Sequence, residues 1–313
     1  MRQILVTDKV HPNLLQGLEN YGMSVTYKPK MPYEEVKKVA HSYNGIIINS
    51  KVICDKKFLT DHQHLEFIGR LGSGLDIIDL TVAKELGVEI INSPEGNANA
   101  VAEHAIGMLL CLTNNLAQAN REVHKFIWNR EPNRGIELEG KTVGIYGFGH
   151  TGSALANKLN TWGVNLITYD KYREDIESDY PYVKTVSLDT LWQESDIISV
   201  HLPLTDETKG IVNKALLGQC KEGAIIINTS RGPIVNTGDL VDDLDSGYLG
   251  GACLDVLENE KLETLSRELK STYQKLFDLD SVILSPHVAG WTKESLIKIA
   301  DYLLMKIGRF YSL

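Results

Sequence analysis

Residues 142–159 read TVGIYGFGHTGSALANKL, in which an apolar run leads directly into three glycines in GxGxxG spacing. Gly147 permits a tight turn, Gly149 lets a pyrophosphate approach the backbone, and Gly152 lets the following helix pack close to the strand. The N-terminus of that helix offers N–H groups and a partial positive charge to phosphates. The order of strand, glycines and helix predicts a Rossmann dinucleotide-binding unit; the alternative is a glycine-rich turn that binds nothing.

A carboxylate follows at the end of the next predicted strand. The run VNLITYD closes at Asp170, 18 residues after Gly152, where it can bind both ribose hydroxyls of an adenosine. Because a 2′-phosphate would be repelled there, the sequence favours NAD over NADP. Arg173 follows closely and could soften that discrimination.

Short apolar runs alternate with helical periodicity on both sides of a polar connector, residues 128–141. This alternation is typical of parallel sheets covered by helices. A long helix is predicted to start near Asn97 and to bridge the two parts, and the amphipathic C-terminal tail has to pack on the first of them. The predicted fold class is α/β, with two doubly wound parallel-sheet domains: a Rossmann cofactor domain (97–290) inserted into a flavodoxin-like domain (1–96 and 291–313).

Composition limits the partners that are compatible with the chain. Its 313 residues are 43% hydrophobic and 23% charged, as in a soluble globular protein, and they carry a net charge of −9. That charge disfavours nucleic acid and anionic membranes, since both require a basic surface. A small anionic substrate stays compatible, because a local group of arginines can bind one on an acidic protein.

The cysteines and the apolar runs predict a cytoplasmic protein. The cysteines are scattered, at Cys54, Cys111, Cys220 and Cys253. They form no CxxC pair and have no histidine at metal-ligand spacing, so we expect reduced thiols and no metal site. No apolar run approaches the length of a membrane span, and the N-terminus lacks the long apolar core of a signal peptide.

Three apolar strands of the second half are each followed by a charged or titratable side chain. The run AIIINTSR delivers Arg231, GACLDVLENE delivers Asp255 and then Glu258 or Glu260, and VILSPH delivers His287. Ligands of open parallel sheets bind beyond the carboxyl ends of the strands. These strand ends, beside a dinucleotide site, therefore predict an active site.

The residue types suit reduction of a 2-oxo acid. His287 can donate a proton to the carbonyl oxygen near neutral pH, and a carboxylate such as Glu260 would orient the imidazole. Arg231 can hold the substrate carboxylate and polarise the carbonyl. The alternatives are a loop histidine, a surface ion-pair arginine and a solvated acid, and Glu258 stays a second candidate for the carboxylate.

Seven segments together resemble the D-isomer-specific 2-hydroxyacid dehydrogenases, which include 3-phosphoglycerate and D-lactate dehydrogenases and glyoxylate and hydroxypyruvate reductases. The segments are GRLGSGLDIIDL (69–80), NSPEGNANAVAEHAIGMLL (92–110), VGIYGFGHTG (143–152), HLPLTDETKGIVN (201–213), INTSRGPIVN (227–236), LDVLENE (254–260) and SPHVAG (285–290). The resemblance covers nearly the whole chain. Two departures are Lys261, where the family usually has proline, and Trp291, where many members have a small residue.

The resemblance implies two lobes that close over a small acid, a homodimer built mainly on the cofactor domain, and Arg231, Glu260 and His287 as catalytic residues. The implied NAD-binding residues are Gly147, Phe148, Gly149, His150, Thr151, Gly152, Asp170, His201, Pro203, Thr208, Thr229, Ser230 and, at the nicotinamide amide, Asp255. The implied substrate-binding residues are Arg70, Leu71, Gly72, Ser73, Gly74, Asn97 and Arg130, with the main chain of residues 71–74 at the substrate carboxylate.

The function that the sequence favours is an NAD-dependent D-2-hydroxyacid dehydrogenase resembling 3-phosphoglycerate dehydrogenase. Arg70 and Arg130 match positions that phosphoglycerate-specific members use for the phosphate. A hydroxypyruvate or glyoxylate reductase is the alternative within the family. An NAD-sensing binding protein of the corepressor type is the alternative from another class.

Overall fold

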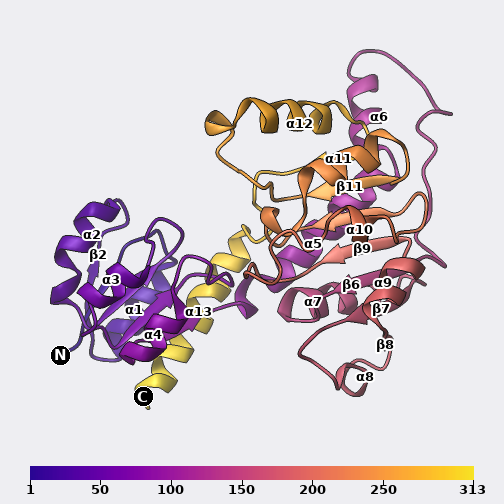
Figure 1. Cartoon of the computed structure of the whole chain (residues 1–313). Coiled ribbons are helices and arrows are strands. Elements are labelled where there is room, and N and C mark those ends of the chain that lie inside the picture. The colour runs from indigo at the N-terminus through magenta and orange to yellow at the C-terminus, as the bar shows by residue number, and fades with distance from the viewer. The chain divides into compact units, whose positions relative to one another are not determined.

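The chain divides into two compact units (Figure 1). The computed structural model describes every residue from 1 to 313. The first unit comprises Met1–Asn99 and Trp291–Leu313, and the second comprises Ala100–Gly290. The second unit is thus an insertion in the chain of the first, as the sequence predicted. The division falls inside helix α5 (Glu95–Thr113), whereas the sequence placed it between residues 96 and 97.

The first unit contains a five-stranded parallel sheet in the order β2-β1-β3-β4-β5. Its strands are β1 (Gln3–Val6), β2 (Ser24–Tyr27), β3 (Gly45–Ile48), β4 (Phe67–Arg70) and β5 (Glu89–Asn92). Its helices are α1 (Pro12–Asn20), α2 (Tyr33–Val39), the 3₁₀ turn η1 (Ala40–Ser42), α3 (Lys56–Asp61), α4 (Leu80–Leu86) and α13 (Lys293–Phe310). This strand order is that of flavodoxin-like sheets, which confirms the prediction.

Helix α13 belongs to the first unit because it supplies part of that unit's core. Leu303 and Ile307 are fully buried in one hydrophobic cluster with Ile4 of β1. The helix begins at a capping box, in which the Thr292 hydroxyl accepts from the Ser295 N–H and the Ser295 hydroxyl accepts from the Thr292 N–H, both at 2.9 Å. An amphipathic helix of this kind has to bury its apolar side, and here it does so against the sheet.

The second unit contains a seven-stranded parallel sheet in the order β12-β11-β10-β9-β6-β7-β8. Counted from β6, this is the 3-2-1-4-5-6 order of a Rossmann sheet with one further strand at the end, so the predicted fold is confirmed. The strands are β6 (Thr142–Tyr146), β7 (Asn165–Tyr169), β8 (Val183–Thr185), β9 (Ile197–Val200), β10 (Ile225–Asn228), β11 (Gly251–Leu254) and β12 (Val282–Leu284). The helices after α5 are α6 (Leu116–Val123), α7 (His150–Leu159), α8 (Ile176–Asp179), α9 (Leu188–Glu194), α10 (Lys214–Leu217), α11 (Thr237–Asp245) and α12 (Arg267–Asp278), with 3₁₀ turns η2 (Gly232–Ile234) and η3 (Leu262–Thr264).

The central strands of this sheet are buried on both faces. In β10, Ile225 and Ile227 belong to one hydrophobic cluster with Leu155 of α7. Ile226, between them, belongs to the other cluster with Trp192 of α9. Successive side chains of a strand point to opposite faces, so a sheet covered on both sides requires such uninterrupted apolar runs.

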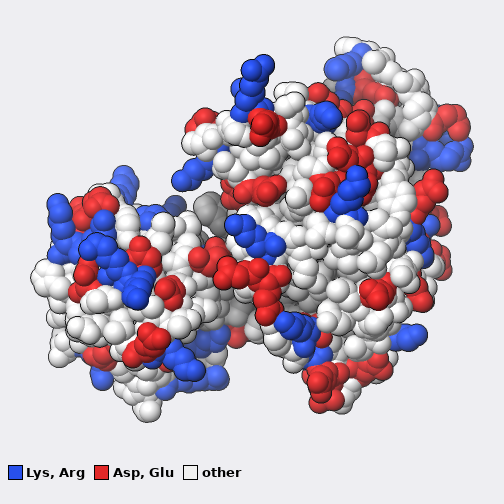
Figure 2. All heavy atoms as spheres, viewed as in Figure 1, with Lys and Arg blue, Asp and Glu red and all other residues white.

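The surface of the two units is mixed in charge. On the face shown in Figure 2, acidic and basic side chains are interspersed over each unit. None of the helices has both the length and the apolar character that crossing a membrane demands. No cluster of three or more His, Cys, Asp or Glu side chains is arranged to hold a metal ion.

Candidate active site

The glycine loop connects the C-terminus of β6 to the N-terminus of α7. Gly147 has a φ of +93°, and a Cβ there would lie 2.8 Å from the His201 carbonyl oxygen. A Cβ on Gly152 would lie 2.3 Å from the Gly147 carbonyl oxygen, so the helix passes too close for a side chain. At Gly149, the N-cap of α7, an added Cβ would meet no atom within 4 Å. The loop therefore leaves open space at a helix N-terminus, as binding of a pyrophosphate requires.

Asp170 follows β7 and its carboxylate contacts the glycine loop. Oδ2 accepts a hydrogen bond from the Phe148 N–H at 2.6 Å, and Oδ1 accepts from the N–H groups of Tyr172 and Arg173 at 2.9 and 3.1 Å. The Arg173 guanidinium pairs with Asp179 at 2.7 Å and donates to the Phe148 carbonyl oxygen at 3.2 Å. The Phe148 side chain is fully buried, so of this residue only the backbone lines the loop.

His201 is buried beside the glycine loop. Its Nδ1 lies 3.0 Å from the Thr151 hydroxyl in the first turn of α7, and its Nε2 lies 2.8 Å from the Ser199 hydroxyl of β9. Burial lowers the pKa of His201 to about 4, so the imidazole is neutral near neutral pH. His201 thus links the end of β9 to the start of α7, whereas His150, one residue before Thr151, is exposed.

The loop after β10 holds a polar group that has no partner in the chain. The Thr229 hydroxyl is buried and makes no hydrogen bond, while the Ser230 hydroxyl donates to Asn228 Oδ1 at 2.7 Å. An unpaired buried hydroxyl is costly, and a bound ligand with a polar group would satisfy it. The Thr208 hydroxyl instead donates to the Pro203 carbonyl oxygen at 2.6 Å within its own turn. The open Gly149 and the unpaired Thr229 together fit a dinucleotide.

The predicted catalytic residues follow three neighbouring strands. Strands β10, β11 and β12 are adjacent and parallel, and their last residues pair across the ladder. Arg231, Asp255 and His287 come one to three residues after those strand ends, so all leave the sheet at the same edge. The Arg231 guanidinium donates to the Ser230 carbonyl oxygen at 2.8 Å.

His287 and Glu260 form an ion pair. His287 Nδ1 lies 2.9 Å from Glu260 Oε1 and 3.0 Å from Oε2, and the two side chains are 44% and 46% exposed. His287 has a φ of +54°, a left-handed conformation that is uncommon for residues other than glycine. Glu258 contacts another element, because its Oε2 accepts from the Thr237 N–H of α11 at 3.2 Å. Of the two carboxylates that the sequence left open, Glu260 is the one that contacts the imidazole.

Asp255 lies at the centre of a hydrogen-bond network under the His287 loop. It is 1% exposed, and its carboxylate accepts from the Ser285 hydroxyl at 2.6 Å and from the N–H groups of Val288 and Ala289 at 2.9 Å. The Ser285 hydroxyl also lies 2.7 Å from Nε2 of His104 in α5. The contact of Asp255 with a nicotinamide amide stays a prediction; the contacts in the chain are with these groups.

The loop after β4 in the first unit has the groups to bind an anion. Gly72 has a φ of +113° and its N–H donates to the Ser93 hydroxyl at 3.1 Å. The Ser73 hydroxyl donates to Asn97 Oδ1 at 2.8 Å. The N–H groups of Ser73 and Gly74 make no backbone hydrogen bond. These two adjacent N–H groups are therefore free of backbone acceptors, as an oxyanion-binding loop requires.

The two arginines predicted at a phosphate lie in different units. Arg70 is the last residue of β4, and its guanidinium donates to the carbonyl oxygen of Leu71, which is buried. Arg130 lies in the exposed connector between α6 and β6. Trp291, noted as a departure from the family, is 79% exposed.

The sequence analysis did not single out three side chains that support the loops of the candidate site. His104 and Ser285 belong to the network under His287, and Tyr273 supports the segment that carries Glu260. The Tyr273 hydroxyl accepts from the Asn259 N–H at 2.8 Å. Tyr273 lies on α12, between Glu260 and His287 in the chain. His104 and Ser285 lie within two of the family segments, 92–110 and 285–290, but nothing in the sequence indicates which side chains they contact, because these contacts arise only in the fold.

Residues 106–289, more than half of the chain, match the family model described as "D-isomer specific 2-hydroxyacid dehydrogenase, NAD binding domain". The chain belongs to this family. The family match lies within the second unit, so the prediction of an NAD-binding domain there is confirmed. It also confirms the resemblance read from the seven segments.

Relatives within the family agree over nearly the whole chain. A D-3-phosphoglycerate dehydrogenase of Archaeoglobus fulgidus is 33% identical over 95% of this chain, and a hydroxypyruvate reductase of Thermotoga maritima is 34% identical over 96%. The chain spans 55% of the former protein and 94% of the latter. The crystal structure of an Aquifex aeolicus D-lactate dehydrogenase, complexed with NAD and lactic acid, is 27% identical with a TM-score of 0.83, covering 99% of this chain and 95% of that one. Thus the chain spans about half the length of the curated phosphoglycerate dehydrogenases it matches.

The buried His201 predicts an acid sensitivity of this family member. Burial lowers the pKa of His201 from 6.5 to about 4. Between pH 4 and pH 6.5 this residue is therefore protonated in the unfolded chain and neutral in the folded chain. Stability from this residue is present above pH 6.5 and is lost as the pH falls, by about 2 kcal/mol between pH 7 and pH 5. Urea unfolding of the wild type and His201→Gln at both pH values measures this, since the amide can still bond both hydroxyls. An equal pH dependence in the two proteins would contradict the assignment.

Proposed function

We propose that the protein is an NAD-dependent oxidoreductase that transfers a hydride between NAD(H) and a small D-2-hydroxy acid or its 2-oxo form. The observation that carries this proposal is the His287–Glu260 ion pair at the sheet edge that also carries Arg231. A half-exposed imidazole oriented by a carboxylate is suited to proton transfer at a carbonyl oxygen near neutral pH.

The ion pair determines which imidazole nitrogen acts. Glu260 occupies Nδ1 of His287, which leaves Nε2 to hold the proton for the substrate oxygen. On reduction, the carbonyl carbon of the 2-oxo acid gains the hydride and its oxygen gains this proton, which gives the 2-hydroxy acid. On oxidation, Nε2 takes the hydroxyl proton back. Arg231 follows β10, two strands from β12 at the same edge of the sheet, and in the proposal its guanidinium fork binds the substrate carboxylate and polarises the carbonyl.

The second unit supplies the residues for the dinucleotide. NAD supplies the hydride chemistry when it is bound. The open backbone at Gly149 and the N-terminus of α7 suit its phosphates, and Asp170 suits a ribose diol. The unpaired Thr229 hydroxyl is available to a further polar group of the ligand. Because Arg173 is paired with Asp179, the nearest fixed charge at the end of β7 is negative, which favours NAD over NADP.

We propose 3-phosphoglycerate and its 2-oxo form as the leading substrate pair, with hydroxypyruvate or glyoxylate as the second. The unpaired amides of Ser73 and Gly74 suit a carboxylate or a phosphate. Arg70 and Arg130 supply the charges that a phosphate would require. The similarity to the hydroxypyruvate reductase of Thermotoga maritima supports the smaller substrates, hydroxypyruvate and glyoxylate, since this chain spans 94% of that protein.

Replacing the proton donor tests the reaction. His287→Ala should lower kcat for hydroxypyruvate reduction by about 10²-fold to 10⁴-fold, the usual contribution of a general acid, and leave the Kd for NADH within about twofold. Absorbance at the NADH band gives turnover, and NADH fluorescence gives binding. His41→Ala, an exposed histidine of the first unit, is the control. A wild type that binds NADH but turns over no 2-oxo acid would instead support an NAD-sensing binding protein.

Two arginine variants decide between the substrate pairs. If a phosphate is bound, Arg70→Ala and Arg130→Ala should each lower kcat/KM for 3-phosphohydroxypyruvate by about 10-fold or more, the value of a charged hydrogen bond. Their kcat/KM for hydroxypyruvate should stay unchanged. Arg134→Ala is the matched control, since it lies in the same connector and pairs with Glu131 at 2.8 Å. Equal losses with both substrates would rule out a phosphate-specific role.

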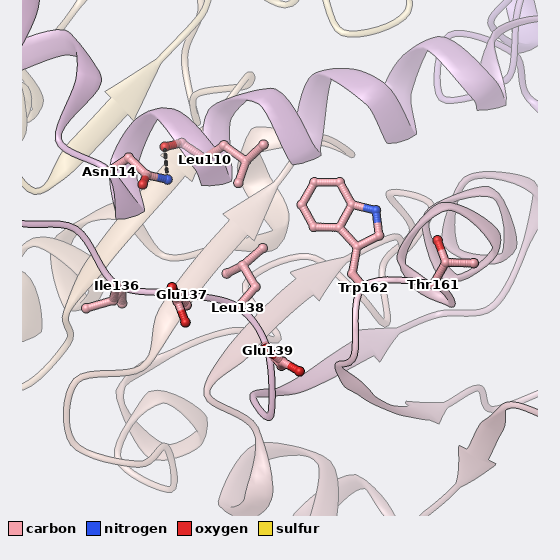
Figure 3. Close-up of a pocket in the computed structure, with 8 residues that line it drawn as sticks. All are labelled: Leu110, Asn114, Ile136, Glu137, Leu138, Glu139, Thr161 and Trp162. Atoms are coloured by element: carbon pink, nitrogen blue, oxygen red, sulfur yellow. Dashed lines mark hydrogen bonds between the residues drawn. The ribbon is translucent and has the colours of Figure 1, made fainter.

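We also propose that the protein is a cytoplasmic homodimer formed through the second unit. Its cysteines are all unpaired, which suits a reducing compartment. The connector around α6 exposes apolar side chains, among them Phe126 at 101% and Trp128 at 79%. The same unit has a hollow of about 440 Å³ (Figure 3), lined by Leu110, Asn114, Ile136, Glu137, Leu138, Glu139, Thr161 and Trp162. None of the predicted site residues lines it, so it suits a protein partner rather than the substrate.

The connector provides the test of the homodimer. Light scattering after size exclusion should give twice 34.9 kDa for the wild type and the monomer mass for the Phe126→Ser, Trp128→Ser double variant. Tyr172→Ser, at a residue 80% exposed elsewhere on the second unit, should stay dimeric. A wild type that is monomeric at micromolar concentration would exclude the interface.

A further inference from the structure

The His287 loop is held in a conformation that it would not adopt alone. His287 has a φ of +54°, and its N–H donates to the Asp255 carbonyl oxygen at 2.7 Å and contacts the Ser285 carbonyl oxygen at 3.1 Å. A left-handed backbone at a residue with a Cβ persists only where surrounding contacts impose it. Here the contacts come from Asp255, whose carboxylate accepts from the N–H groups of Val288 and Ala289, directly after His287.

Ser285 extends this network to helix α5. Its hydroxyl lies 2.6 Å from Asp255 Oδ1 and 2.7 Å from His104 Nε2. A hydroxyl has one proton and a carboxylate only accepts, so Ser285 donates to Asp255 and accepts from His104 Nε2–H. The Met108 sulfur, at 3.6 Å, is a weak competing acceptor. His104 and Asp255 are 3.6 Å apart, too far for a direct hydrogen bond, so the hydroxyl carries the link.

This network lies next to both places where the chain passes between the units. The chain enters the second unit at Ala100, four residues before His104, and leaves it at Gly290, one residue after Ala289. Helix α5, in which the chain enters the second unit, is therefore joined to residues 285–289, after which the chain leaves it. The link consists of one serine and one aspartate within the second unit. His287 lies within the joined segment.

We propose that His104 and Ser285 are positioning residues, which act through Asp255 to hold the His287 imidazole in line for proton transfer. This inference rests on the proposed role of His287. Ser285 is one of the donors that hold the Asp255 carboxylate, and His104 in turn fixes the Ser285 hydroxyl. Loss of either side chain therefore loosens the carboxylate and the loop that it holds. Neither His104 nor Ser285 has to contact a substrate or cofactor for this role.

Kinetics of three His104 and Ser285 variants test the proposal. His104→Leu and Ser285→Ala should lower kcat by about 10-fold to 10²-fold, the effect of a small displacement of a reacting group. KM and the Kd for NADH should change much less than kcat, because neither substituted side chain contacts substrate or cofactor in this proposal. His104→Gln should recover most of kcat, since its amide can still donate to Ser285. The matched control is Glu103→Gln, the neighbouring residue of α5, which pairs with Lys158 at 2.9 Å.

Hydrogen exchange gives a readout that does not depend on turnover. In the protein without cofactor, amides of residues 287–289 should exchange faster in His104→Leu and Ser285→Ala than in the wild type, with Glu103→Gln unchanged. Unchanged exchange and unchanged kcat would overturn the proposal, as would an equal loss in His104→Gln. If His287→Ala keeps its turnover, the proposed function fails on its own, whatever the exchange experiment gives.

Discussion

Parallel register between β10, β11 and β12 is the constraint on which the candidate active site depends. The last residues of these strands pair across the ladder, so the loops that follow all begin at one edge. Glu260 and His287 are 27 residues apart in the chain, yet their side chains meet because these two loops begin on adjacent strands. A slip of one residue would turn each side chain of a strand to the other face of the sheet. In the central strands β10 and β11, every residue is buried, which opposes such a slip.

Glu260 and Asp255, the two carboxylates that contact the His287 side chain and its loop, differ in their exposure to solvent. The His287–Glu260 pair is nearly half exposed, so its contribution to the free energy of unfolding is about 0–1 kcal/mol. Under the proposed function, the pair instead serves to orient a half-exposed imidazole for the substrate. Asp255 is 1% exposed, and a buried carboxylate without donors would cost several kcal/mol. Its three donors remove that cost and at the same time fix the loop that carries His287.

The sheets and the strand ends could be predicted because they depend on short stretches of sequence. Contacts between residues far apart in the chain could not. The glycine spacing and the apolar alternation predicted both sheets, and the strand ends predicted Arg231, Asp255 and His287. The choice between Glu258 and Glu260 needed coordinates, because both lie in the same short loop. The contact of His104 could not be predicted, since its partner Ser285 is 181 residues away in the chain. The left-handed φ of His287 could not be predicted either, because glycine is the usual sequence indication of such a conformation and this position is a histidine.

The preference for NAD over NADP depends on whether the Arg173 guanidinium is paired within the chain or free to bind a 2′-phosphate. This arginine is three residues from Asp170, and an unpaired guanidinium there would attract a 2′-phosphate. The ion pair with Asp179 at 2.7 Å and the hydrogen bond to the Phe148 carbonyl oxygen hold it instead. The Asp170 carboxylate is anchored by three backbone N–H groups, so it cannot easily swing away from an incoming phosphate. A phosphate would then bring up to two negative charges beside a fixed one, a repulsion that a neutral ribose diol avoids.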